Sequence, residues 1–219
     1  AVPSFSTAGA PVTIIGTSGE NWARQHAYRA KGEYAFSKST IASLQYVRQY
    51  YSTAYAGFHS ALIDASGNSV YNGTFLFNNN GTLQRLTVTP LNFLQAPVES
   101  NSHFTGLTAQ HEFASKDNLR LDASYYYVPG FQFRSPATGA TEFAGPGSQT
   151  FGVRRKYEIS AQYSGTIRRH HYIVGEDTRL DMAKNANFLL SNWTIESSRV
   201  NQTLHAMGRS INQSVYVQD

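Results

Sequence analysis

Apolar and polar residues alternate along much of the chain, which is the pattern of β-strands that bury one face and expose the other. The clearest run is DNLRLDASYYYV at 117–128, and the segments 26–37 and 153–163 alternate in the same way. Sequences rich in Asn, Asp and Gly stand between such runs at 64–69 and 78–82, as tight hairpin turns require. The pattern predicts a mainly β, antiparallel fold: a sandwich, a jelly roll or a calycin-like barrel.

Two segments have helical spacing instead. From residue 41 to residue 62, apolar residues recur every three or four positions, and Ser39 or Thr40 can cap a helix there. This spacing predicts a helix over about 40–56 that ends at Gly57. The same segment is rich in Tyr, Thr and Val, which favour strands. A weaker pattern predicts a second short helix over 178–190.

No linker or internal repeat divides the chain, so we interpret residues 1–219 as a single β-rich domain. Residues 1–15 are interpreted as an extended N-terminal arm, which in a structural subunit would pair with a neighbour's sheet. The segment 128–150 is rich in proline and glycine and predicts a long surface loop. The start AVPSFSTAG lacks an initiator methionine, which indicates a mature product without its signal peptide.

Composition narrows the class of protein. Only 15% of the residues are charged, whereas 41% are hydrophobic and 13% are aromatic, a balance typical of extracellular β-proteins. The chain has no cysteine, which excludes disulfides, zinc–thiolate centres and cysteine nucleophiles, and no cofactor is expected. The net charge is +4, but the basic residues are scattered, so a nucleic-acid partner is not expected. No run of about 20 apolar residues predicts a membrane-spanning helix.

Five Asn-x-Ser/Thr sequons indicate a secreted or extracellular-surface glycoprotein. The expected glycosylation sites are Asn72, Asn80, Asn192, Asn201 and Asn212.

The stretch SGTIRRHHYIVGEDTR at 164–179 holds the densest candidate chemistry. In a hairpin of 153–163 with 167–174, adjacent strand residues point to opposite faces, so His170 and His171 cannot share a metal ion, and no metal site is predicted. In an enzyme, His170 and Tyr172 would serve as base and acid, and Arg168 would neutralise an anionic substrate. Otherwise the cluster is a solvated sheet face. Its predicted members are Glu158, Ser160, Gln162, Arg168, His170 and Tyr172.

Aromatic residues beside the 128–150 segment suggest a ligand-binding surface. Rings at a sheet edge suit a sugar or a small apolar ligand, and the alternative is that they anchor the loop to the core. The ligand-binding candidates are Tyr126, Phe131, Arg134, Arg154, Glu158 and Gln162.

These features support four hypotheses. The first is a secreted or cell-surface β-domain, without enzymatic activity, that binds a glycan or a small apolar ligand. The second is a carbohydrate-active enzyme, preferably a polysaccharide lyase acting on an anionic glycan. The third is a homo-oligomeric structural subunit of a fibre, capsid or surface layer. The fourth is an outer-membrane barrel, which alternating strands allow but which Arg155 and Arg169 on apolar faces disfavour, so a membrane partner is not expected.

Overall fold

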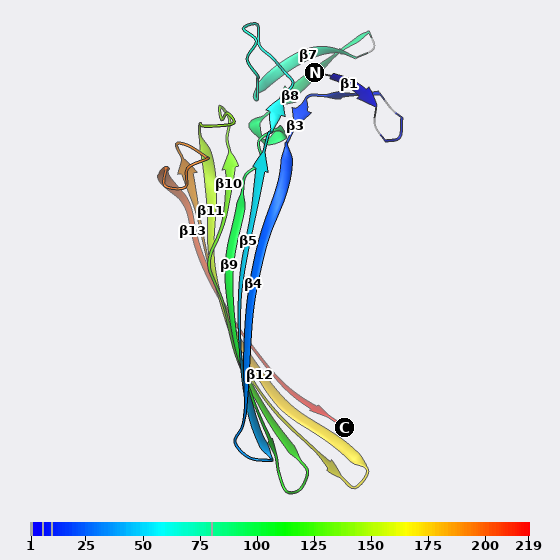
Figure 1. The fold of residues 1–219 in the computed structure, drawn as a ribbon, viewed down its shortest axis with the longest axis vertical. Helices are drawn as coiled ribbons and strands as arrows, with labels where there is room; N and C mark the ends of the chain where they lie inside the picture. The colour runs from blue at the N-terminus through cyan, green and yellow to red at the C-terminus, as the bar shows by residue number, and fades with distance from the viewer. Residues whose placement is uncertain (1, 6, 10, 80) are drawn as a thin grey trace.

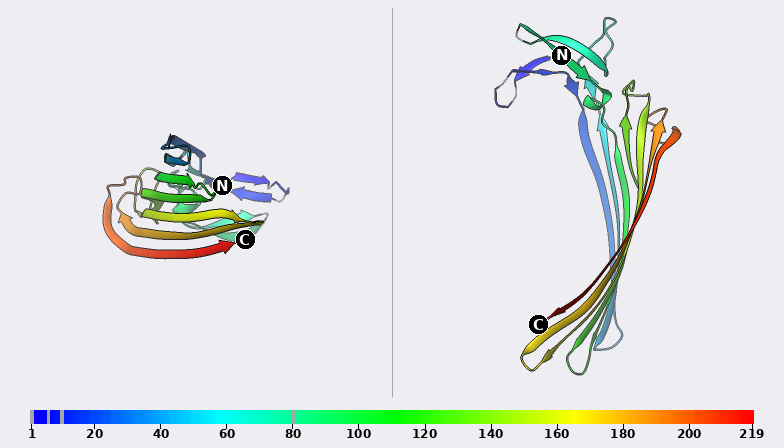
Figure 2. Two further views of the ribbon diagram at one scale, coloured as in Figure 1. Left: turned by 90° about the horizontal axis from the view of Figure 1, so that it is seen from below. Right: turned by 180° about the vertical axis from the view of Figure 1, so that it is seen from behind.

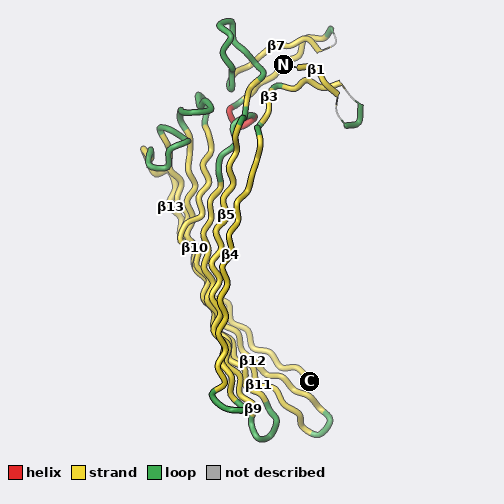
Figure 3. The backbone as a smooth tube through the Cα atoms, in the orientation of Figure 1, coloured by secondary structure: helices red, strands yellow, loops and turns green. Residues whose placement is uncertain are grey.

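The computed structural model of the chain describes residues 2–5, 7–9, 11–79 and 81–219. Strands make up most of it, joined by turns and loops, and one short 3-10 helix, η1 (Pro90–Asn92), lies among them (Figures 1 and 3). Seven long strands form one antiparallel sheet in the order β13-β12-β11-β10-β9-β5-β4. They are β4 (Glu20–Ala35), β5 (Thr40–Ala56), β9 (Val98–Glu112), β10 (Asn118–Pro136), β11 (Gly147–Ile167), β12 (His170–Leu190) and β13 (Arg199–Gln218).

Three small two-stranded sheets lie at one end of the large sheet, at the top of Figure 1. The N-terminus is at this end and the C-terminus is at the other, as the view from behind in Figure 2 also shows. The small sheets pair β1 (Val2–Phe5) with β2 (Pro11–Ile14), β3 (Gly16–Thr17) with β6 (His59–Ser60), and β7 (Gly73–Asn79) with β8 (Thr82–Val88).

The strands of the large sheet are unusually long, at 15 to 21 residues. At about 3.3 Å per residue they extend roughly 50–70 Å, and the sheet twists strongly along that length (Figure 1). Its two ends differ in their connections. The end away from the N-terminus has short turns at 36–39, 113–117 and 168–169, whereas the other end has longer connections at 57–97, 137–146 and 191–198.

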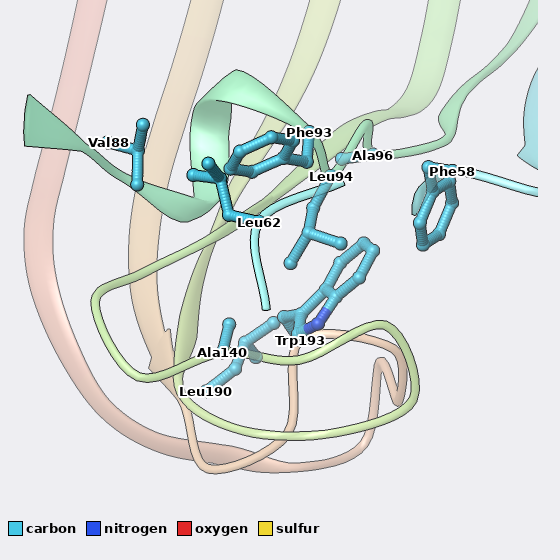
Figure 4. Close-up of a cluster of buried hydrophobic side chains, with 9 residues drawn as sticks. All are labelled: Phe58, Leu62, Val88, Phe93, Leu94, Ala96, Ala140, Leu190 and Trp193. Carbon is cyan, nitrogen blue, oxygen red and sulfur yellow. The ribbon is translucent and has the colours of Figure 1, made fainter. Parts of the chain in front are cut away.

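A closed hydrophobic core forms within these longer connections, which we call the cap (residues 57–97, 137–146 and 191–198). Phe93 is completely buried and Trp193 is 2% exposed. The Trp193 indole nitrogen donates a hydrogen bond to the carbonyl of Thr141 at 2.9 Å, which joins two of the connections. Figure 4 shows the cluster: Phe58, Leu62, Val88, Phe93, Leu94, Ala96, Ala140, Leu190 and Trp193.

The mainly β, antiparallel class predicted from the sequence is confirmed, and a large sheet with smaller sheets is consistent with a β-sandwich. The calycin-like barrel is not formed in the described part of the chain. There, β4 pairs with β5 and β13 pairs with β12, and these two outer strands do not pair with each other. Among the described residues we find no helix with the length and hydropathy needed to cross a membrane.

Both predicted helices are wrong. Residues 40–56 are strand β5, and 178–190 belong to β12. The helical spacing in β5 arose because apolar residues occur on both faces of the strand: Leu44 lies on one face, and Ile41 and Val47 lie on the other. Residues of β12 pair with both β11 and β13, so neighbouring strands satisfy their backbone hydrogen bonds and outweigh a weak local pattern.

Two predicted irregular segments are also more regular than expected. Within 128–150, β10 continues to Pro136 and β11 begins at Gly147, so the loop is confined to 137–146. A β-bulge between Val128 and Phe131 accommodates the intervening proline and glycine without ending the strand. Within the described part of 1–15, β1 pairs with β2 in an antiparallel manner. That this segment pairs with a neighbour's sheet stays a prediction.

Candidate functional site

The predicted polar cluster at the β11–β12 hairpin does not assemble. The turn is Arg168–Arg169, and Ile167 pairs with His170, whereas the sequence suggested a loop at 164–166. This shift of register moves one strand by an odd number of residues, so it exchanges the faces. His170 and Tyr172 therefore lie on the face opposite to Glu158, Ser160 and Gln162.

The three catalytic candidates lie at the short-turn end of the sheet. Arg168 occupies the turn in the left-handed backbone conformation, with φ of 59°. The Nδ1 atom of His170 is 3.0 Å from a carboxylate oxygen of Asp219, and both side chains are exposed. The Tyr172 ring lies beside Tyr163, with 6.0 Å between ring centroids. His170 is thus paired with the side chain of Asp219 and not with Tyr172, the predicted acid.

The ligand-binding candidates are divided among several places. Tyr126, Arg154, Glu158 and Gln162 share one face of the sheet, and Phe131 follows the bulge in β10. Arg134 donates from Nη1 to the carbonyl of Thr194 at 2.6 Å, so it anchors a cap connection.

The sequons are also placed in different surroundings. Asn72 is exposed next to β7, and Asn201 and Asn212 are exposed on the outer strand β13. Asn192 accepts hydrogen bonds from the amide and the hydroxyl of Thr194, and Asn80 lies outside the described residues. Among the residues that are described, no group of three His, Asp or Glu side chains could hold a metal ion.

One face of the large sheet carries a continuous strip of apolar side chains. Residues directly opposite each other on paired strands share a face, as do alternate residues along a strand. By this rule three neighbouring rows cross all seven strands, and we call them the apolar band. It comprises Ala30, Gly32, Tyr34, Ala42, Leu44, Tyr46, Thr105, Leu107, Ala109, Leu121, Ala123, Tyr125, Tyr157, Ile159, Ala161, Glu176, Thr178, Leu180, Ile211, Gln213 and Val215.

Most side chains of the apolar band are exposed and the others are half-buried, although most of them are aliphatic or aromatic. Ile159, at the centre of the sheet, is 63% exposed, and Leu44 and Ile211 are each 54% exposed. Glu176 is the one charged member of the band. Contiguous apolar surface of this extent is rare on water-soluble monomers and marks a surface that contacts something else.

A row rich in cations and aromatic rings limits the band on the side of the cap. We call it the basic border row: Tyr28, Arg48, His103, Tyr127, Arg155, Met182 and Arg209. The Arg155 guanidinium lies 5.4 Å from the centroid of the Tyr127 ring.

Aromatic rings also gather at the other limit of the band, beside the short turns. Tyr34 contacts Phe36 edge to face, at 4.9 Å between centroids. Phe113 contacts Tyr163 in the same manner, at 6.0 Å. The band therefore has rings along both of its borders.

The opposite side of the same rows, the polar face, is dominated by charged and hydrogen-bonding groups. Lys156 lies 2.6 Å from Glu158, and the hydroxyl of Thr108 donates to Asp122 at 2.6 Å. Four ion pairs lie on this face: Lys31–Glu33, Arg120–Asp122, Lys156–Glu158 and Arg179–Asp181. The two faces thus differ in the chemistry that they present, although Ile41 and Val47 of β5 also lie on the polar face.

No protein-family model, curated protein or solved structure is found to match this chain. The alternation that creates the apolar band is visible in the sequence, where it predicts a buried face. The register, which aligns the rows across seven strands, could not be read from the sequence.

Proposed function

We propose that the seven-stranded sheet spans a lipid bilayer, with the apolar band against the hydrocarbon and the polar face toward water. The observation that carries this proposal is the segregation of the two faces, which is clearest in β10 and β11 and is interrupted by Glu176 in β12 and by Ile41 and Val47 in β5. Hydrocarbon is the surrounding that suits exposed side chains such as Ile159 and Leu44, whereas ion pairs such as Lys156–Glu158 suit water.

The dimensions of the band fit a bilayer. From Leu119 to Tyr127, β10 contributes nine residues when both border rows are counted with the band, which is the lower limit of the about 9–11 residues with which a strand crosses the hydrocarbon core. Tyrosine and arginine at a border can place apolar atoms in the hydrocarbon and polar atoms among the headgroups. The basic border row and the rings near the short turns correspond to the two surfaces of the membrane.

The connections between the strands also differ between the two ends of the sheet, as the proposed arrangement requires. Proteins that cross a bilayer with antiparallel strands have short turns on one side and long loops on the other. Here the turn Arg168–Arg169 has two residues, whereas the connection 57–97 carries part of the cap. The cap then stands in water on one side of the membrane.

This proposal departs from the expectation that a membrane is not a partner, and the placement of the two arginines removes the reason for that expectation. Arg155 belongs to the basic border row, and Arg169 lies in a turn. Both would therefore meet headgroups and not hydrocarbon.

The outer strands impose a further requirement. In hydrocarbon every backbone amide and carbonyl needs a hydrogen-bond partner. We therefore infer that β4 and β13 pair with further antiparallel strands when the sheet is in the bilayer. The polar face would then border an aqueous path, and guiding polar solutes along that path is the function that we propose.

Glycan binding, polysaccharide lyase activity, a role as a structural subunit, secretion and glycosylation stay predictions from the sequence.

Labels on two adjacent residues test the proposal, and the absence of native cysteine makes single labels unambiguous. Ile159→Cys places a fluorescent label on the apolar band, and Ser160→Cys, its matched control, places the label on the polar face. In phospholipid vesicles, we expect nitroxide-bearing lipid to quench the first label and aqueous iodide to quench the second. Equal quenching of both labels by iodide would show that the sheet does not lie in the bilayer.

A further inference from the structure

A groove of about 540 Å³ opens on the face of the apolar band, where the basic border row crosses β10 to β13. The side chains that define its chemistry are Tyr127, Arg155, Met182, Lys184, Met207 and Arg209.

The register of the sheet brings three cations around this groove. Arg155 and Arg209 both lie directly opposite Met182, one on each side of it. With about 4.8 Å between strands, their Cα atoms are roughly 10 Å apart. Lys184 is the next residue of β12 on the same face, so it completes a triangle. Long side chains from the three corners can converge on one anionic group.

These cations are not neutralised by the protein. No acidic side chain lines the groove, and in the described part of the chain none of Arg155, Lys184 and Arg209 forms an ion pair. On the polar face, by contrast, Lys156 has Glu158 as its partner. Guanidinium groups bind phosphate oxygens through paired hydrogen bonds, and ammonium groups add charge, so this groove suits a phosphate group.

The rest of the lining is apolar. Met182 and Met207 are flexible and polarisable side chains that adapt to irregular apolar ligands. The next row of the sheet on the same face belongs to the apolar band, where Leu180 lies opposite Ile211. A ligand with both an anionic phosphate and a hydrocarbon chain would therefore satisfy both parts of the surface.

We propose that this groove binds the phosphate-bearing headgroup of an anionic phospholipid, whose acyl chain lies on the apolar band. The proposal rests on the proposed function, because it assumes that the band contacts lipid. Basic pockets at the level of the headgroups are an established way for membrane proteins to hold anionic lipid. The phosphate of the lipid would give these three cations the anionic partner that the protein does not provide.

The test uses the full chain folded in neutral detergent micelles and titrated with phosphatidylglycerol, phosphatidylcholine or inorganic phosphate, with bound lipid counted by native mass spectrometry. We expect preferential binding of phosphatidylglycerol. The triple variant Arg155→Gln, Lys184→Gln and Arg209→Gln should bind it roughly 100-fold more weakly, since each cation near a membrane surface contributes about a fivefold factor. The single variant Lys184→Gln should lose about fivefold.

The matched control for the single variant is Arg85→Gln, which removes an exposed cation of the cap. It should keep the affinity for phosphatidylglycerol within about twofold of the original, because Arg85 lies outside the groove and, in the proposed arrangement, stands in water. Equal affinity for phosphatidylglycerol and phosphatidylcholine would overturn the proposal. Inorganic phosphate binding as tightly as the lipid would replace it with a free-anion site. Failure of the two-label experiment with selective lipid binding retained would reject only the membrane-spanning arrangement.

Discussion

The cap and the apolar band contain the same kinds of side chain in opposite situations. In the cap, Phe93 and Trp193 are buried against other residues of the chain, whereas Ile159 in the band is 63% exposed. The cap therefore supplies its own apolar surroundings. The band has the apolar composition of a protein core, but no other part of the described chain covers it. The stability of the sheet therefore depends on what surrounds the molecule.

The largest expected effect belongs to the cap. Phe93→Ala removes a completely buried ring and should destabilise the cap by about 3–5 kcal/mol, equally in detergent and in vesicles. Hydrogen exchange of the cap amides measures this change. The matched control is Leu91→Ala, in the short helix η1 that directly precedes Phe93, because Leu91 is 62% exposed and its loss should cost less than about 0.5 kcal/mol. Similar costs for both variants would show that the cap core is not closed.

A charge in the middle of the apolar band should have the next largest effect. Ile159→Arg should lower the free energy of unfolding in vesicles by about 2–4 kcal/mol, because the guanidinium would enter hydrocarbon. Urea unfolding of vesicle-embedded protein provides the measurement. On a water-exposed strand the same change would cost less than about 0.5 kcal/mol.

The neighbouring residue supplies the control for this charge. Ser160→Arg adds the same side chain to the polar face of the same strand and should change the unfolding free energy by less than about 0.5 kcal/mol. If Ile159→Arg is as well tolerated as Ser160→Arg, the band faces water. The band would then differ from the cap core only in being exposed, and lipid would not stabilise it.

The sequence predicted the strands better than their arrangement. Alternation located much of β10 and β11, because polar and apolar residues there follow a period of two. It failed for β5, where Ile41 and Val47 add apolar side chains to the polar face and imitate helical spacing. Pairing with β4 and β9, which lies outside any local window, decides the conformation of β5.

The candidate site was less predictable because it depends on register. Ser164–Thr166 contains glycine and looks like a turn, yet the strands continue through it to Arg168–Arg169. The longer pairing places Tyr157 opposite Leu180 and Tyr163 opposite Val174, and such apolar matches fix the register along the whole hairpin. Alternation in a sequence also cannot distinguish a strand face that is buried in a protein core from one that faces lipid, since both need apolar side chains.

A smaller effect should come from an aromatic pair in the row of the apolar band that lies next to the basic border row. The rings of Tyr125 and Tyr157 lie 4.8 Å apart between centroids on neighbouring strands. A double-mutant cycle with Tyr125→Ala and Tyr157→Ala should give a coupling of about 0.5–1.5 kcal/mol in the unfolding free energy. The pair Tyr125 and Tyr127 should couple less, because their centroids are 6.0 Å apart. Equal coupling energies for Tyr125–Tyr157 and Tyr125–Tyr127 would mean that these rings stabilise the protein through contact with the membrane and not through contact with each other.

The smallest effect concerns the surface of the cap, at Asp64, which is the exposed counterpart of its buried core. The backbone amide of Asn68 donates to the Asp64 carboxylate at 2.9 Å and is the main cause that lowers the pKa of that carboxyl below its usual 3.8. The amide of Ser66 also donates, at 2.8 Å. Because the pKa of Asp64 is lower in the folded protein than in the unfolded chain, this stabilisation is complete above the pKa of the unfolded chain. It is lost as the pH falls through the pKa of the folded protein.

The carboxyl resonance of Asp64 should therefore titrate with a midpoint below 3.8. Asp64→Asn should remove the acid-induced loosening of the 64–68 turn, and a midpoint at or above 3.8 would contradict the turn geometry.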